Sequence, residues 1–559
     1  MHNPNLIAIR CLDCGHALAA SEIMAKACPS CGSGWLDAVY DLARVAPEWR
    51  AGLGVRELSL WRYEALLPIH RTHHELSMGE GWTPLTRLYP YEARYQHKGG
   101  IYVKDERAQP TNSFKDRQAA LTVMGLKQAG IREIVLASTG NAGVAYAAYC
   151  ARAGIRMWLF VTSLVPSEKM REAALYGCKV VKVSGTYDET KHVAAEFAQR
   201  QGLHFDRGAK SVLGKDSMKT LAFEIAEQLG LQTAGTGWRA PDWYIQAVSG
   251  GIGPLGVWKG FQELHAMGLI DKMPKLGIVQ AAGCAPMVEA FQRGDRHATP
   301  VIPQTLITVL ATGDPSKSYE LLFDAVQSNG GTMLALEDGD TFTAMRQLAS
   351  VGGLSVEPAT AVAFGGLERM LSEGIITPDE RVVVNCSGHT FSAEGHVLGD
   401  QYEQYVLEAR QQGEEGKRIV PQLDGLGGAL NQLDNNVKAI VLIDDSPDDR
   451  RLIRKLLRSN KRYIIYEADN GRDGMKAMHE HRPDLVILDL TLPDMDGLSI
   501  LETIQRDQTL RDIPLIVYSA RDLTHAEKDR LNNLKRVFVP KTGLDRKKFL
   551  ATIEDELSE

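Results

Sequence analysis

Short apolar runs alternate with longer amphipathic stretches over most of this chain, and this alternation restricts the folds that it can adopt. Between residues 51 and 399, such runs begin at Glu133, Met157, Cys178, Trp243, Lys275 and Arg381. Buried strands separated by helices are typical of wound α/β folds, in which ligands bind in loops at the carboxyl ends of the strands. The sequence therefore predicts an α/β core with its site in those loops.

A second alternation of the same kind follows near the C-terminus. Helical stretches there separate apolar runs that begin at Ala439, Tyr463, Leu485, Leu515 and Val537. This pattern predicts a five-stranded doubly wound sheet. The segment before it is rich first in Gln and Glu and then in Gly, so we expect a linker. The 559 residues are thus expected to divide into segments 1–45, 46–405, 406–436 and 437–559.

Charge and hydropathy exclude several classes of protein. With 63 basic and 70 acidic side chains the net charge is -7, whereas a dominant nucleic-acid surface needs clustered positive charge, so we expect no nucleic-acid partner. The start of the chain lacks the basic and apolar segments of a signal peptide. The longest uncharged run, residues 134–151, contains Ser, Thr, Gly and Asn in its middle and fits a strand, loop and helix better than a membrane span. We expect a cytoplasmic protein with no membrane partner.

Four of the eight cysteines form two C-x-x-C pairs near the N-terminus. Cys11 and Cys14 make the first pair, Cys28 and Cys31 make the second, and a glycine follows each pair. The two-residue gap turns both sulfurs of a pair toward one ion, and four thiolates leave no position open for water. We therefore predict a structural zinc ribbon over residues 1–45. The alternative, disulfides or redox-active pairs, is disfavoured in a cytosolic chain.

Three loops after predicted strands carry residues that suit an aldehyde, a carboxylate or a phosphate. Lys115 stands at the start of a helix, where the positive end of the helix dipole favours the neutral amine, which can attack an aldehyde. The loop of residues 138–143 offers amides and hydroxyls at a helix N-terminus, and the glycines of residues 248–256 bring N–H groups close to a phosphate. Each loop alone also has an ordinary explanation: a solvated lysine, a capped turn and a glycine turn.

Together these loops resemble the fold-type-II pyridoxal-phosphate (PLP) enzymes of the tryptophan synthase β family, with threonine synthases the closest match. The resemblance covers about residues 11–400 and rests on the motifs Pro-Thr-x-Ser-Phe-Lys-Asp-Arg, Ser-Thr-Gly-Asn-Ala-Gly and Gly-x-Trp-Lys-Gly, the first of which contains Lys115. It implies a PLP-dependent core of two subdomains and a small amino-acid substrate. We also expect a homodimer.

The resemblance implies a role for each matching residue. Lys115 looks like the lysine that holds PLP as a Schiff base and later takes the substrate's α-proton. The other implied cofactor-binding residues are Phe114 beside the ring, Asn141 on the ring hydroxyl, Ser387 at the pyridine nitrogen, and the phosphate loop Ser249, Gly250, Gly251, Ile252 and Gly253. The substrate carboxylate is implied to bind to Ser138, Thr139 and Gly140.

The implied reaction is a carbon–oxygen lyase reaction in which O-phosphohomoserine and water give threonine and phosphate. Threonine synthases usually carry an arginine for the substrate's phosphate before a Lys-Thr pair, and residues 209–220 of this chain lack it. Lys210 or Lys215 is a candidate substitute, although lysine lacks the bidentate fork of arginine. Two alternatives therefore stay open. One is a dehydratase or β-replacement enzyme acting on a serine-type or phosphoserine-type substrate, and the other is a signalling or scaffold protein that binds ligand without turnover.

Residues 437–559 carry polar residues at the ends of their predicted strands. Carboxylates that converge on one sheet edge repel one another unless a hard cation such as Mg²⁺ neutralises them. The residues concerned are Asp444 and Asp445 after the first strand, Asp489 after the third, Ser519 after the fourth and Lys541 after the fifth. This segment resembles the receiver domain of two-component response regulators, with a flavodoxin-like (βα)5 fold.

The resemblance implies that Asp489 accepts a phosphoryl group from a histidine kinase or another phosphodonor. Ser519 and Lys541 would contact the incoming group, and Phe538 occupies the place of the aromatic switch residue. The implied ligands of Mg²⁺ are Asp444, Asp445, Asp489 and the backbone carbonyl of Thr491. Phosphorylation is expected to change enzyme activity or oligomeric state.

Overall fold

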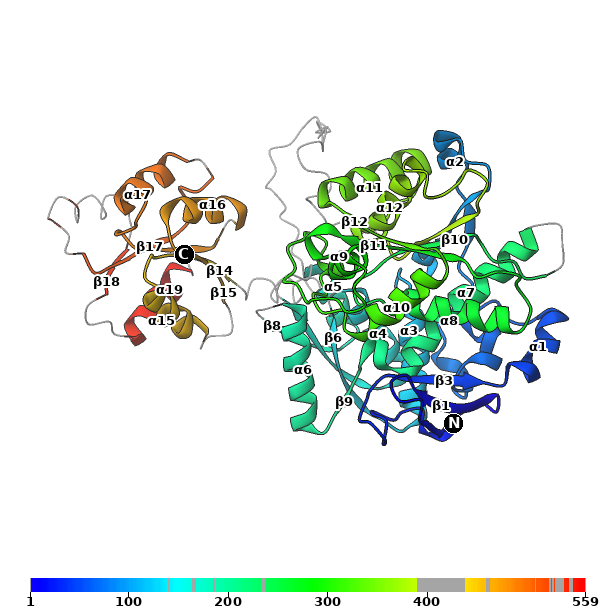
Figure 1. Cartoon of the computed structure of the whole chain (residues 1–559). Helices are drawn as coiled ribbons and strands as arrows, with labels where there is room; N and C mark the ends of the chain where they lie inside the picture. Colours follow the sequence, from blue (N-terminus) through cyan, green and yellow to red (C-terminus); the bar gives the residue numbers. More distant parts are fainter. Residues whose placement is uncertain are drawn as a thin grey trace, which may run out of the picture. The chain divides into compact units, whose positions relative to one another are not determined.

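The computed structural model describes residues 2–389 and 438–557, except for 139, 163–166, 184–185, 233–236, 459–462, 482, 508, 522–523, 525–526, 528–536 and 542–545. The expected linker, residues 406–436, therefore lies outside the described residues. The chain forms two units, Met1–Leu407 and Glu408–Glu559, which are taken separately here (Figure 1). No helix in the described ranges is long and apolar enough to cross a membrane.

The first unit begins with a small antiparallel sheet of order β2-β1-β3. Its strands are β1 (Leu6–Cys11), β2 (Ala17–Ala19) and β3 (Leu36–Tyr40). Alternate residues of β3 are buried, so one face of this sheet packs into the main core of the unit. Helix α1 (Leu42–Arg50) follows, and the side chain of Asp41 caps its start by accepting a hydrogen bond from the backbone N–H of Arg44.

A six-stranded sheet of order β12-β11-β10-β13-β5-β4 forms the larger α/β layer. All neighbouring strands are parallel except the edge pair β4–β5, which is antiparallel. The strands are β4 (Leu85–Arg87), β5 (Ile101–Asp105), β10 (Trp243–Ala247), β11 (Lys275–Ala281), β12 (Thr332–Leu336) and β13 (Val382–Cys386). The accompanying helices are α2 (Tyr89–Tyr95), α8 (Ile252–Ala266), α9 (Pro286–Arg293), α10 (Lys317–Ser328), α11 (Asp338–Gly352) and α12 (Pro358–Ser372).

A four-stranded parallel sheet of order β8-β7-β6-β9 forms the second layer of the enzyme unit. Its strands are β6 (Glu133–Ser138), β7 (Arg156–Thr162), β8 (Lys179–Val183) and β9 (His204–Phe205). The helices beside it are α3 (Lys115–Gln128), α4 (Asn141–Ala153), α5 (Ser167–Leu175), α6 (Tyr187–Gln201) and α7 (Val212–Gln232). The six apolar runs that the sequence predicts as strands are β6, β7, β8, β10, β11 and β13, so the predicted α/β core of two subdomains is confirmed.

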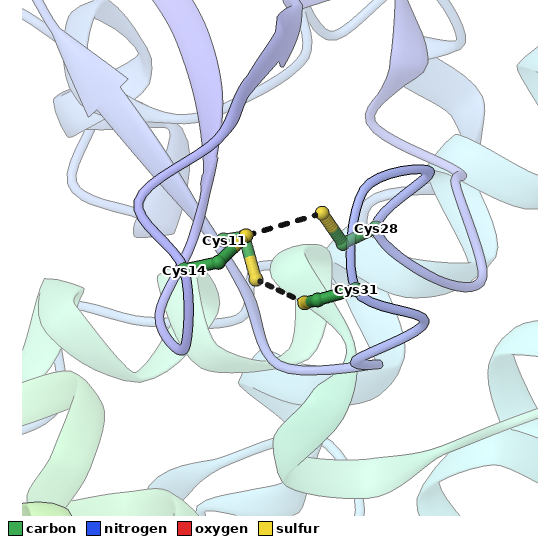
Figure 2. A group of neighbouring side chains, drawn as sticks. All are labelled: Cys11, Cys14, Cys28 and Cys31. Atoms are coloured by element: carbon green, nitrogen blue, oxygen red, sulfur yellow. Dashed lines mark hydrogen bonds between the residues drawn. The ribbon is translucent and has the colours of Figure 1, made fainter.

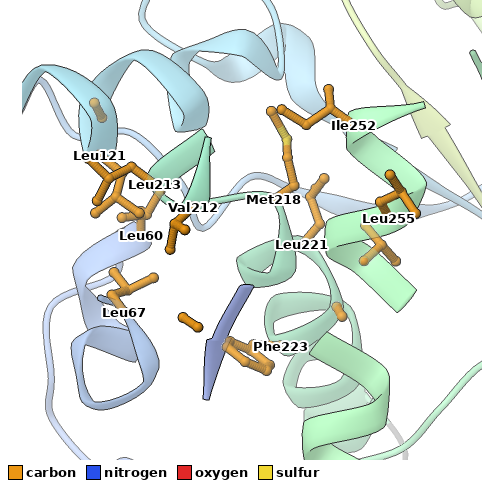
Figure 3. Packing of buried hydrophobic residues seen from close by; sticks show 14 of the residues in the cluster. Leu60, Leu67, Leu121, Val212, Leu213, Met218, Leu221, Phe223, Ile252 and Leu255 are labelled. Atoms are coloured by element: carbon orange, nitrogen blue, oxygen red, sulfur yellow. The ribbon is translucent and has the colours of Figure 1, made fainter. Parts of the chain in front are cut away.

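Helix α7 runs through the middle of this unit and is buried along nearly its whole length. It packs against α3 and α8, where glycines allow close approach: a Cβ atom at Gly256 would lie 2.5 Å from the carbonyl oxygen of Lys215. Figure 3 shows the surrounding apolar side chains, among them Leu60, Leu67, Leu121, Val212, Leu213, Met218, Leu221, Phe223, Ile252 and Leu255. This packing fixes the helix ends that face the site.

The second unit is a five-stranded parallel sheet of order β15-β14-β16-β17-β18, as predicted. Its strands are β14 (Lys438–Ile443), β15 (Tyr463–Ala468), β16 (Leu485–Leu488), β17 (Leu515–Ser519) and β18 (Val537–Pro540). Its helices are α15 (Pro447–Arg458), α16 (Gly471–His481), α17 (Gly497–Arg506) and α19 (Arg546–Glu556). This is the flavodoxin-like strand order, which gathers the strand ends at one edge.

Candidate functional site

A cavity of about 310 Å³ lies where strand ends of both large sheets meet helix N-termini. The ends of β6 and β10 and the first residues of α3, α4 and α8 line it. Most of the predicted cofactor and substrate residues lie on its wall: Phe114, Lys115, Ser138, Gly140, Asn141, Ser249, Gly250, Gly251, Ile252, Gly253 and Ser387. Thr139 lies outside the described residues. The structure thus brings together predicted residues that lie up to 273 positions apart in the sequence.

Lys115 is the first residue of α3 and projects into the cavity. Its Nζ lies 3.4 Å from Gln118 Oε1 and 4.6 Å from the centre of the Phe114 ring. Burial lowers the pKa of Lys115 to about 8, against the opposing charges of Asp206 and Glu357. The amine is therefore partly neutral near physiological pH, as a nucleophile or general base requires.

The turn before Lys115 is held by hydrogen bonds on both sides. Asp116 accepts hydrogen bonds from the backbone N–H (3.1 Å) and hydroxyl (2.9 Å) of Thr111, and the N–H of Phe114 donates to the carbonyl of Ser387. Asn112 adopts a φ of 60°, and Asn is among the residues that tolerate this left-handed conformation. The asparagine therefore suits this turn.

Glu357 joins two of the predicted residues and is itself one that the sequence prediction missed. Asn141 Nδ2 donates to both of its carboxylate oxygens, at 3.0 and 2.8 Å, and Ser387 Oγ donates at 2.9 Å. Lys169 Nζ lies 3.5 Å away, and both charged side chains are buried. A buried carboxylate needs such partners. The available signal was the Val-Glu-Pro-Ala-Thr segment, in which Glu357 directly precedes a helix with proline at its start.

In the loop between β6 and α4, the hydroxyl of Ser138 binds to backbone N–H groups. Ser138 Oγ accepts hydrogen bonds from the N–H groups of Gly140 (3.1 Å) and Gly143 (2.9 Å), so it caps the start of α4. A Cβ atom at Gly140 would lie 2.9 Å from Val309 Cγ1, so this close packing requires glycine. The role of Ser138 and Gly140 toward a substrate carboxylate stays a prediction.

The glycine loop leads from β10 into the N-terminus of the 15-residue helix α8. Gly251 has a φ of 81°, which L side chains rarely adopt, and Gly250 would have no atom within 4 Å of an added Cβ. Ser249 contacts the hydroxyl of Thr312 across the loop. Open space, glycine backbone and the positive end of a helix fit a phosphate group, so these residues suit the phosphate of PLP.

The four N-terminal cysteines converge from two turns of the same geometry (Figure 2). In each turn the glycine after the second cysteine, Gly15 or Gly32, has a φ of 74° and donates its N–H to the carbonyl of the first cysteine. The sulfurs of Cys11 and Cys31 lie 3.6 Å apart, those of Cys14 and Cys28 lie 3.7 Å apart, and all four lie within 4.8 Å of one another. All eight cysteines are free, so the disulfide alternative is not the arrangement seen here.

The predicted acidic residues of the second unit meet at one edge of its sheet. Carboxylate oxygens of Asp444, Asp445 and Asp489 lie within 4.8 Å of one another. Lys541 Nζ lies 2.7 Å from Asp444 and 2.6 Å from Asp489, and Ser519 Oγ donates to Asp489 at 2.6 Å. Burial raises the pKa of Asp444, and the nearby charge of Asp489 acts in the same direction.

The surroundings of this acidic group add one residue that the sequence prediction missed. Asp449, in the first turn of α15, lies 2.9 Å from Lys541 Nζ. Against the effect of burial, hydrogen bonds to Asp444, Asp489 and Asp449 raise the pKa of Lys541. The N–H of Thr491 donates to Asp489 at 3.1 Å, and Phe538 is half-buried against the apolar core.

Two α/β layers around a cavity with a buried amine and a glycine-lined helix N-terminus define the first unit as an enzyme core for a phosphorylated cofactor. The family model "Pyridoxal-phosphate dependent enzyme" matches residues 76–388, and the chain belongs to this family. A second family model, "Response regulator receiver domain", matches residues 440–553, so the chain joins a PLP-dependent enzyme to a receiver domain.

Two curated relatives match this chain over nearly their own full lengths. The threonine synthase of Methanocaldococcus jannaschii is 35% identical over 68% of this chain and 91% of the relative. The threonine synthase of Methanosarcina acetivorans is 30% identical over 72% of this chain and 96% of the relative. Among solved structures, holo diaminopropionate ammonia lyase from Escherichia coli is similar with a TM-score of 0.50 and 18% identity, covering 58% of this chain and 88% of that one. At that identity the similarity shows the fold alone.

Proposed function

We propose that this protein is a PLP-dependent lyase of the threonine synthase type, which converts O-phosphohomoserine and water to threonine and phosphate. The observation that carries the proposal is Lys115, whose pKa is lowered to about 8 in a cavity also lined by Asn141, Ser387 and the glycine loop. The two threonine synthases that match over more than nine-tenths of their length support the same reaction.

PLP, when bound, supplies an electron sink for negative charge at the substrate's α-carbon. Proton transfer and the binding of anionic groups fall to side chains and amides of the protein itself. Lys115 Nζ holds and moves a proton, which its lowered pKa allows near neutral pH. The amides at the start of α8 would hold the phosphate of PLP, and Ser387, whose hydroxyl donates a hydrogen bond to Glu357, would offer a neutral hydroxyl to the ring nitrogen. Asn141 and Ser387 are positioned by Glu357.

The rate at which PLP-free protein takes up PLP is expected to rise with pH and to level off above about 8, the pKa of Lys115. Uptake needs the neutral amine, and below its pKa the amine is increasingly protonated. The measurement is the growth of visible absorbance after PLP is added at a series of pH values. A lysine with the usual pKa of 10.5 would instead give a rate that still rises at pH 10.

A substrate panel on PLP-loaded protein tests the reaction itself. O-Phosphohomoserine, L-serine, L-threonine and O-phosphoserine are supplied in turn, and release of phosphate and ammonia is followed. Threonine and phosphate from O-phosphohomoserine support the proposal. Ammonia from serine or threonine, or turnover of O-phosphoserine, would replace it by a dehydratase or β-replacement reaction. No turnover of any of these would favour a ligand-binding signalling protein.

The four sulfurs of Cys11, Cys14, Cys28 and Cys31 are proposed to bind one structural zinc ion, since four thiolates fill its tetrahedral shell. Replacing Cys11 with serine is expected to reduce the zinc content from about one ion per chain to near none and to lower the melting temperature. Elemental analysis and thermal unfolding check this. Cys178→Ser, at a half-buried lone cysteine, is the control and should keep its zinc. Wild-type protein that purifies without zinc would contradict the assignment.

The second unit is proposed to bind Mg²⁺ through Asp444, Asp445, Asp489 and the carbonyl of Thr491, and to take up a phosphoryl group on Asp489. Acetyl phosphate with Mg²⁺ is expected to label wild-type protein, whereas Asp489→Asn should show little of that label because, among the described residues, Asp489 is the carboxylate that both Ser519 and Lys541 contact. Asp448→Asn, at an 89% exposed side chain, is the control. Phos-tag electrophoresis reports both, and equal labelling of Asp489→Asn would contradict the prediction.

We further propose that segments 1–45, 46–405, 406–436 and 437–559 act as zinc ribbon, enzyme, linker and receiver of a cytoplasmic homodimer. Phosphorylation of Asp489 by a histidine kinase would change enzyme activity or oligomeric state. Kinetics and light scattering with and without acetyl phosphate test this. Identical rates and identical size in both conditions would leave the regulatory proposal without support.

A further inference from the structure

Three cations gather on one part of the cavity wall, apart from Lys115. Lys191 belongs to helix α6, and Arg207 and Lys210 lie between strand β9 and helix α7. Lys191 is exposed at the mouth of the cavity, and the other two side chains are half-buried. None of these residues follows from the PLP motifs.

Among the described residues the three cations form no ion pair, although the charges of Asp188, Asp206 and Asp314 act on Lys191, Arg207 and Lys210 in turn. Within the part of the chain that the structure describes, none of them has a carboxylate within 4.0 Å. Burial, followed by the charges of Lys191 and Arg207, lowers the pKa of Lys210, so Lys210 lies near enough to the other two cations to be repelled by them.

Two carboxylates on the same wall accept their hydrogen bonds from other groups, although their charges still act on Arg207 and Lys210. Asp206 accepts hydrogen bonds from the Tyr146 hydroxyl at 2.9 Å and from the N–H of Gly208 at 2.8 Å. Asp314 accepts one from the N–H of Ser316 at 2.8 Å. A group of cations without a close ion pair is stabilised by an anionic ligand.

The N-terminal cysteine segment holds two of these cations in place. Arg207 donates its Nη2 to the carbonyl of Ala25 at 2.9 Å and its Nη1 to that of Lys26, both in the stretch between the two cysteine pairs. Lys210 Nζ lies 5.9 Å from the centre of the Trp35 ring, and Trp35 itself lines the cavity. Arg207 and Lys210 are therefore positioned by contacts with the N-terminal segment.

The other candidate from the sequence, Lys215, is committed to the interior. Its Nζ donates to the carbonyl of Leu36 at 2.8 Å and lies 3.1 Å from Asp37. It is buried and does not line the cavity. Of the two lysines that stand near the position of the missing arginine, only Lys210 is placed to meet a ligand.

We propose that Lys191, Arg207 and Lys210 form the subsite for the phosphate of the amino-acid substrate, in place of the single arginine that this chain lacks. This inference rests on the proposed function, because that function names the substrate, a phosphate monoester. Three positive side chains match a dianion better than a carboxylate, and hydrogen bonds from charged donors are the strong ones. The glycine loop at the start of α8 remains for the cofactor's phosphate, so the two anions have separate sites.

The test uses PLP-loaded protein, so that the cofactor's own phosphate site is filled. Lys191→Met and Lys210→Met are each expected to raise the KM for O-phosphohomoserine and the Kd for inorganic phosphate about tenfold, with a smaller change in kcat, because each removes one charged hydrogen-bond donor. Phosphate binding is measured by calorimetry. Lys210→Arg keeps the charge and should restore most of the affinity.

Lys272→Met is the matched control, since it removes one positive charge from a half-exposed lysine outside the cavity wall. The visible absorbance of bound PLP should be unchanged in every variant, which excludes a loss of folding. An unchanged KM and phosphate Kd in both cavity variants would overturn the subsite and leave the proposed reaction standing. Lysine-dependent phosphate binding without turnover of O-phosphohomoserine would support the subsite and overturn the proposed reaction.

Discussion

Replacing Lys115 with alanine is expected to reduce turnover by at least about 10³-fold and to remove the visible absorbance of bound PLP. The lysine is the one amine at the start of α3 that projects into the cavity, and burial keeps its pKa near 8, where it can both attack an aldehyde and move a proton. Among the described residues on the cavity wall, Lys191 and Lys210 are the other lysines, and both belong to the proposed phosphate subsite. Steady-state kinetics and an absorbance spectrum measure the two effects.

A control for this variant lies on the same helix. Lys127 is near the C-terminal end of α3, where its Nζ donates to the carbonyl of Ala153 at 2.8 Å, away from the cavity. Lys127→Ala should keep the PLP absorbance and change turnover by less than about twofold. If Lys115→Ala retained the absorbance of the wild-type protein, the assignment of Lys115 as the PLP lysine would be wrong.

The fold was predictable because its local signals agree with its long-range packing. The predicted apolar run at Trp243, for example, is fully buried as strand β10, whereas the run at Cys178 forms the partly exposed strand β8. The two cysteine turns are equally local, since each needs only a two-residue gap and a glycine with positive φ. In such cases a short stretch of sequence contains the whole physical reason for the structure.

The residues of the site could be predicted from the sequence only where a motif contains them. Glu357 and Lys169 lie 188 residues apart in the sequence, and only the packing of α5 beside the start of α12 brings their charges within 3.5 Å. Lys210 and Lys215 have the same side chain and lie in the same segment. Helix α7 begins at Val212, so Lys215 lies inside the helix against β3 while Lys210 precedes it and meets the cavity. The different positions of Lys210 and Lys215 thus depend on where helix α7 begins, which no sequence motif predicted.

Arg117, two residues after Lys115, illustrates a motif residue whose role is structural. Its guanidinium donates to Glu106 from Nε at 2.7 Å and to Glu224 from Nη2 at 2.8 Å, and all three side chains are fully buried. Lys104 completes the network, with its Nζ 2.7 Å from Glu224. Burial alone would raise the pKa of Glu224, but Arg117 and Lys104 lower it to about 2. The Glu224 carboxylate therefore stays ionised in the interior.

Replacing Arg117 with methionine is therefore expected to lower the free energy of unfolding by about 3–5 kcal/mol, because two buried carboxylates lose their main partner. Arg156→Met is the control: this guanidinium is 75% exposed beside Glu133, and its loss should cost less than about 1 kcal/mol.

Urea unfolding followed by tryptophan fluorescence measures the difference, and all eight tryptophans lie before residue 260, so the signal comes from the enzyme unit alone. Because Arg117 lies in the first turn of the helix that carries Lys115, weaker PLP absorbance should accompany the loss of stability. Equal stability of the two variants would mean that the buried network is not what holds this helix start.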